Sequence, residues 1–113
     1  MNKKCLTLLL LLSNSLSAFA ATEQIPIDRK ITKIRTYKNY AMVYISPKFE
    51  NTQGCGRADG NAKLIINLEN NANTEMYTLA MAAGISEKAI GLGINGCYNA
   101  TGFPSIYRVD VQL

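Results

Sequence analysis

Residues 63–97, KLIINLENNANTEMYTLAMAAGISEKAIGLGINGC, decide the fold because the hydrophobic period changes twice within them. Residues 63–68 alternate in the manner of a strand, with Leu, Ile and Leu on one face. A stripe at helical spacing follows, formed by Met76, Leu79, Ala80 and Ala83. Residues 90–97 then alternate again and end at a cysteine. The segment predicts a strand, a short helix and a second strand.

The ends of this helix carry recognisable signals. Asn73 or Thr74 can cap the first turn, where Glu75 places a carboxylate that the helix dipole favours. Gly84 follows the apolar stripe and is typical of a C-terminal stop. In the next strand, glycines occupy one nearly bare face, which suits the close approach of another element.

Two further strands precede this segment. Residues 22–26 read as a loose lead-in, and residues 27–37 are rich in Ile and Thr, which favours a strand with a bulge near Ile31. Lys38 and Asn39 suit a tight turn. A strand of period two comes next, with one face formed by Ala41, Val43 and Ile45. These segments predict a hairpin.

A long loop, residues 48–61, separates the hairpin from the third strand, and a fifth strand ends the chain. The alternation of this last strand places on one face Tyr107, Val109, Val111 and Leu113. The order is strand, strand, strand, helix, strand, strand, so the protein is predicted to be mainly β with one helix. That order fits a small OB-like five-stranded barrel. The alternative is a five-stranded antiparallel sheet with one packed helix.

The N-terminus has the three parts of a secretory signal peptide. Lys3 and Lys4 precede an apolar run at 6–12, and Ala18-Phe19-Ala20 supplies the small residues of a cleavage site. The apolar run is far shorter than the roughly 20 residues that a spanning helix needs. We therefore predict a signal peptide at residues 1–20, a single OB-like domain at 21–113, no membrane span, and a periplasmic or secreted location.

Cleavage leaves two cysteines, Cys55 and Cys97, in an oxidising compartment. A disulfide is the simplest interpretation, and two free thiols are the alternative. The bond would close a loop across 42 positions, which the chain-entropy description values at about 4 kcal/mol. In a domain of this size, that is a large part of the expected stability.

Composition argues against most enzyme classes. The chain contains no histidine, which removes Ser–His and Cys–His catalysis and most zinc sites, and its eight carboxylates are scattered. The formal net charge is +4, and the densest basic stretch, residues 29–38, is best explained as a solvated strand face. We predict no catalytic residues, no metal site, no cofactor and no nucleic-acid partner.

The disulfide also suggests where a ligand could bind. It would bring the Cys55 loop, with Arg57 and Asp59, to the loop that carries Tyr98 and Phe103. Mixed charge and aromatic side chains suit a polar ligand or a protein partner. These four residues are the candidate binding residues.

Three segments carry a resemblance: residues 76–84, 90–97 and 102–109. They resemble a group of small secreted proteobacterial proteins, mostly uncharacterised, that have one disulfide and an OB-like fold. The layout is more distantly similar to the B subunits of bacterial A–B toxins. That resemblance implies a homo-oligomer that binds glycans. We therefore expect an exported, non-enzymatic binding module for a glycan or protein partner. The alternative is a periplasmic inhibitor or envelope-structural protein acting through a strand edge.

Overall fold

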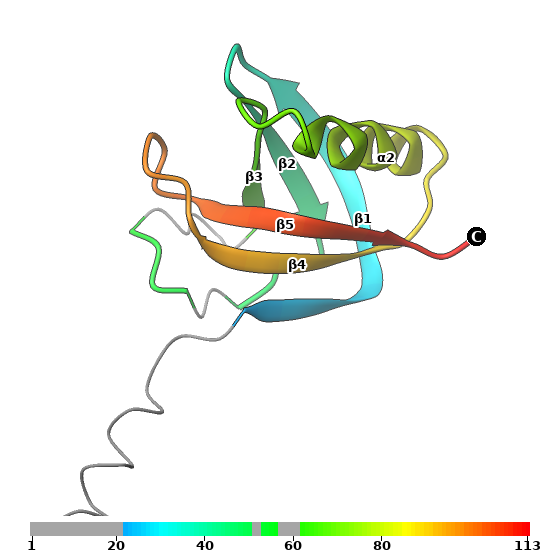
Figure 1. Cartoon of the computed structure of the whole chain (residues 1–113). Helices are drawn as coiled ribbons and strands as arrows, with labels where there is room; N and C mark the ends of the chain where they lie inside the picture. Colours follow the sequence, from blue (N-terminus) through cyan, green and yellow to red (C-terminus); the bar gives the residue numbers. More distant parts are fainter. Residues whose placement is uncertain (1–21, 51–52, 57–61) are drawn as a thin grey trace, which may run out of the picture.

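A computed structural model describes residues 22–50, 53–56 and 62–113 of the chain (Figure 1). The predicted signal peptide, residues 1–20, lies outside the described residues, as do Arg57 and Asp59. The elements follow the predicted order: β1 (Glu23–Thr36), β2 (Tyr40–Ser46), β3 (Lys63–Asn67), α2 (Asn73–Ile85), β4 (Ile90–Cys97) and β5 (Pro104–Val111). No helix in the described ranges has the length and apolar character needed to cross a membrane.

The five strands close into a small barrel in the order β1-β2-β3-β5-β4. Four of the five pairings are antiparallel, and β3 meets β5 in parallel at Ile65 and Ser105. Helix α2 packs across one side of the strands, as Figure 1 shows. The predicted OB-like barrel is confirmed, whereas the alternative antiparallel sheet is wrong, because the parallel pair closes the ring.

Strand β1 is longer than the sequence suggested. The predicted lead-in, residues 22–26, is largely strand, and Ile25 is only 4% exposed. The first part of β1 pairs with β4, and the part from Lys30 onward pairs with β2. The register on β4 shifts between Ile25 and Arg29, around Pro26, which cannot donate a ladder hydrogen bond. The predicted bulge is confirmed, between Ile31 and Lys33.

Helix α2 buries a slightly different stripe from the predicted one. Ala80 and Ala83 are buried and Met76 packs on the core, but Leu79 is 39% exposed. Tyr77 takes its place against the core, and its hydroxyl lies 2.7 Å from the Thr36 Oγ1. The phenol therefore joins the helix to the end of β1.

The predicted helix ends are also displaced. Ala72 occupies the N-cap position without a side-chain hydrogen bond, and the Asn73 amide instead donates to the Asn67 carbonyl at 2.8 Å. The helix continues past Gly84 to Ile85. Gly84 does not end the helix. It lets the helix pack closely on β1, because a Cβ at this position would lie 3.4 Å from the Ile31 side chain.

The glycines of β4 permit two close contacts, as predicted from its bare face. A Cβ on Gly91 would stand 2.8 Å from the Ile25 carbonyl oxygen, and one on Gly93 would stand 2.7 Å from the Tyr107 ring. Tyr107 is 42% exposed, whereas Val109, which the alternation places on the same face, is buried. The cause is a register shift in the β4–β5 ladder between Gly93 and Ile94, which turns Tyr107 outward.

We expect Gly91→Ala to destabilise the protein by about 2–3 kcal/mol, because the added methyl meets the backbone of a neighbouring strand. Gly93→Ala should cost about 1 kcal/mol, since the exposed Tyr107 ring can swing aside. Gly56→Ala, with open space around its Cβ, is the control. Urea unfolding of the three variants measures the ranking, and an equal cost for all three would contradict it.

Candidate functional site

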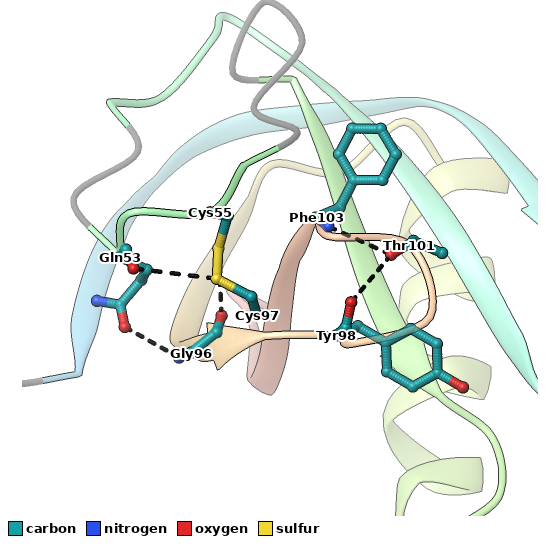
Figure 2. Close-up of a disulfide and its surroundings, with 7 residues drawn as sticks. All are labelled: Gln53, Cys55, Gly96, Cys97, Tyr98, Thr101 and Phe103. Carbon is teal, nitrogen blue, oxygen red and sulfur yellow. Dashed lines mark hydrogen bonds between the residues drawn. A yellow bond between two sulfur atoms is a disulfide. The ribbon is translucent and has the colours of Figure 1, made fainter.

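A disulfide joins Cys55, in the loop after β2, to Cys97, at the end of β4, with a Cα–Cα distance of 5.6 Å (Figure 2). A hydrogen bond beside the disulfide also joins the two segments: the Gly96 N–H donates to the Gln53 Oε1 at 2.9 Å. The sulfurs also lie 3.8 and 3.9 Å from the carbonyl oxygens of Gly96 and Gln53. These are contacts only, because a disulfide sulfur has no proton to donate. The predicted disulfide therefore fixes the loop together with Gln53.

The loop after Cys97 is held by its own backbone. The Tyr98 N–H donates to the Phe103 carbonyl at 2.8 Å, and the Gly102 N–H donates to the Tyr98 carbonyl at 2.7 Å. The Thr101 hydroxyl accepts from the Phe103 N–H at 3.2 Å, as Figure 2 shows. Gly102 has a φ of +77°, a conformation that favours glycine. The loop is therefore preorganised, which lowers the entropy lost when a ligand binds.

The two described candidate binding residues differ in exposure. Phe103 is 6% exposed and packs with Met42 and Ile65 in a small cluster outside the main core. Tyr98 is half-buried at the edge of this cluster, and its ring centroid lies 5.3 Å from that of Tyr40. Phe103 therefore packs beneath the loop as a buried side chain, whereas Tyr98 is accessible at the surface.

A hollow of about 520 Å³ lies beside Tyr98. The ends of β3 and β4, the loop after Cys97 and the start of β5 supply its lining, which consists of Asn67, Glu69, Asn95, Gly96, Cys97, Tyr98, Asn99, Ala100 and Ser105. Three amides, one carboxylate, one hydroxyl and one phenol thus converge on one concave surface. Only Tyr98 of these side chains was a predicted binding residue.

The electrostatics of the hollow are mildly acidic. Burial, followed by the nearby Glu69 carboxylate, raises the pKa of Tyr98 above its ordinary value, so the phenol keeps its proton at neutral pH. The Asn67 Oδ1 accepts from the Glu69 N–H at 2.9 Å, which fixes an amide that lines the hollow and whose NH₂ group is a donor. Asn95 and Asn99 are exposed. The hollow therefore offers donors and acceptors without a positive charge.

This lining suits a hydroxyl-rich ligand better than a metal or a reacting group. An amide both donates and accepts, a carboxylate accepts, and a phenol does both while its ring offers an apolar face. Within the described ranges, no three cysteine or carboxylate side chains gather as metal ligands. The arrangement can bind a polar molecule through several directed hydrogen bonds.

The sequence did not reveal Asn67, Glu69, Asn95, Asn99 and Ser105 as a group. They lie on four separate segments and meet because β3 and β4 both flank β5. The asparagines near 70 and after Cys97 are the only sequence signal, and asparagine is common in turns.

No protein-family model matches the sequence, and no curated protein matches it at a significant level. Solved structures do match. One is a porcine E. coli heat-labile enterotoxin B-pentamer in complex with lacto-N-neohexaose, at 13% identity and a TM-score of 0.51. Another is heat-labile enterotoxin in a crystal structure of lactose binding, at 15% identity and a TM-score of 0.52. Each match covers 90% of this chain and 96% of the other. The chain shares the fold of these toxin chains.

Loss of the disulfide should lower the free energy of unfolding by about 4 kcal/mol, because the bond closes a 42-residue separation. Urea unfolding of the Cys55→Ser/Cys97→Ser variant tests this. Reductant should reproduce the effect in the native protein and change nothing in the variant. Alkylation of both cysteines without prior reduction would contradict the bond itself.

Proposed function

We propose that this protein is an exported, non-enzymatic glycan-binding module and that the hollow beside Tyr98 holds the sugar. The observation that carries the proposal is the lining of that hollow, where amides, a carboxylate and an aromatic ring share one concave surface. Sugars present many hydroxyl groups and apolar C–H faces, which match those side chains. The OB fold is also known to bind oligosaccharides.

The charge of the hollow favours a neutral glycan. Glu69 accepts hydrogen bonds from sugar hydroxyls, and the same carboxylate repels an acidic sugar. The two enterotoxin structures hold lacto-N-neohexaose and lactose. These two sugars support a glycan as the ligand of this chain.

An exported location and a homo-oligomer complete the proposal. The signal-peptide pattern at residues 1–20 and the disulfide fit an oxidising compartment such as the periplasm or the exterior. One matched structure is a B-pentamer, which supports self-assembly here. The alternative, an inhibitor or envelope-structural protein acting through a strand edge, has less support, because the edges that β1 leaves are confined to its two halves, each of which pairs with one neighbour.

Glu69→Gln should weaken binding of a neutral glycan about tenfold or more, because it removes a charged hydrogen-bond acceptor. Tyr98→Ala should weaken glycan binding by a similar factor, and Tyr98→Phe should keep the part of the affinity that the aromatic ring contributes. Asn71→Ala is the control, since Asn71 is exposed and lies outside the hollow. A glycan array first identifies a bound sugar, and calorimetry then compares the variants. Absence of any signal from the native protein on the array would contradict the proposal.

Self-association has its own test. Sedimentation of the purified protein should give a mass several times that of one chain, and this mass should persist at micromolar concentration. A single-chain mass at all concentrations would remove the oligomer from the proposal while leaving the hollow intact.

A further inference from the structure

A row of three side chains crosses the outer faces of β1, β2 and β3, which lie side by side in Figure 1. The strand registers pair Lys33 with Tyr44 and Tyr44 with Lys63. The Lys33 Nζ lies 4.8 Å from the centroid of the Tyr44 ring, and the Lys63 Nζ lies 5.7 Å from it. One aromatic ring therefore holds two ammonium groups close together on the surface.

Arg35 extends this row along β1. It lies two residues beyond Lys33 on the same face, about 7 Å further along the strand. A hydrogen bond with Tyr37, followed by the electrostatic effect of Tyr44, raises its pKa above the ordinary value. Like other arginine side chains, Arg35 is positively charged at neutral pH.

The charges of Lys33 and Arg35 are not neutralised within the described part of the chain. Both residues are exposed, and neither takes part in the ion pairs there, which join Arg29 to Asp28 and Arg108 to Asp110. A cation–π contact fixes the position of an ammonium group without cancelling its charge. The surface therefore presents two positive charges that still attract an anion, and the Tyr44 ring fixes the position of the Lys33 ammonium.

We propose that this surface is a second binding site, which takes the sulfate or carboxylate groups of an acidic polysaccharide. Lys33 and Arg35 contact the anionic groups, and Tyr44 positions Lys33. The site goes beyond the neutral sugar proposed for the hollow, whose Glu69 repels anions. Charges spaced along an extended strand match a polymer that carries charges at intervals.

Two other anionic partners fit this surface less well. Single-stranded nucleic acid needs free aromatic faces for its bases, but Tyr37 and Tyr40 stack on each other at 4.7 Å and ammonium groups lie over the Tyr44 ring. A membrane surface favours exposed apolar side chains beside the charges. Here the apolar residues directly beneath the row are buried, namely Met42, Ile65 and Phe103, and the exposed Ile85 lies on the helix side of Lys33 and not within the row.

Dextran sulfate and unmodified dextran provide a matched pair of probes, since they differ only in sulfate. The native protein should bind immobilised dextran sulfate and not dextran, and binding should weaken as salt rises. The Lys33→Gln/Arg35→Gln variant should bind about fivefold to tenfold more weakly, because two exposed charge contacts are lost. The Lys48→Gln/Lys88→Gln variant is the control for net charge, since it also removes two positive charges and both lysines are exposed. Polygalacturonate replaces dextran sulfate to compare carboxylate with sulfate.

The role of Tyr44 has a separate readout. Tyr44→Phe keeps the ring and should keep the affinity for dextran sulfate, whereas Tyr44→Leu removes the cation–π contact and should lower it. Binding of a neutral glycan in the hollow should stay unchanged in both Tyr44 variants and in the Lys33→Gln/Arg35→Gln variant. A protein that binds no glycan on the array but still shows this sulfate dependence would lose the proposed function and keep this site.

Three results would overturn the second site. One is equal binding of dextran and dextran sulfate. Another is an equal loss of affinity in the Lys48→Gln/Lys88→Gln and Lys33→Gln/Arg35→Gln variants, which would indicate general electrostatic attraction. The third is binding to vesicles of phosphatidylserine without binding to either acidic polysaccharide, which would indicate a membrane partner.

Discussion

The sharing of β1 between two neighbours is the constraint on which the rest of the structure depends. One half of this strand pairs with β4 and the other half with β2, so the strand must bend as it passes from one to the other. The bend brings the Ile25 carbonyl against β4, where only glycine at position 91 leaves room for it. The barrel therefore closes where the backbone of β1 contacts β4 at Gly91, and the hydrophobic core fills the interior of the barrel.

The opposite side of the ring creates the hollow. Strands β3 and β4 are far apart in the sequence, and both flank β5. Their ends therefore meet, which places Asn67 and Glu69 near Asn95 and Asn99. The disulfide at Cys97 and the hydrogen bond from Gly96 to Gln53 fasten the neighbouring loop at the same point. The barrel and its covalent bond thus stabilise the same surface that offers the polar lining.

The local alternation of apolar and polar residues predicted the order of the helix and strands well. It failed where the pairing with another strand decides which side chains are exposed or where a strand begins. Alternation in Ala41, Val43 and Ile45 gave the correct inward face of β2, because a strand buried on one side must alternate. The same rule grouped Tyr107 with Val109 on one face, but a bulge against β4 reverses the faces within β5 and leaves only Val109 buried. Residues 22–26 looked like a lead-in because their partner lies some seventy positions later. The hollow was invisible for the same reason, as its side chains come from segments joined only by the closed ring.

The cluster of Met42, Ile65 and Phe103 explains why one side of a small barrel can carry more than one surface. These side chains point away from the main core and yet are buried, so they form a second apolar layer under the loop after Cys97. Buried apolar packing holds the aromatic rings above it in fixed positions. Tyr98 borders the hollow near Glu69, and Tyr44 borders Lys33. A shared apolar support can therefore order an acidic and a basic surface at the same time, because it fixes the rings while leaving the charges in water.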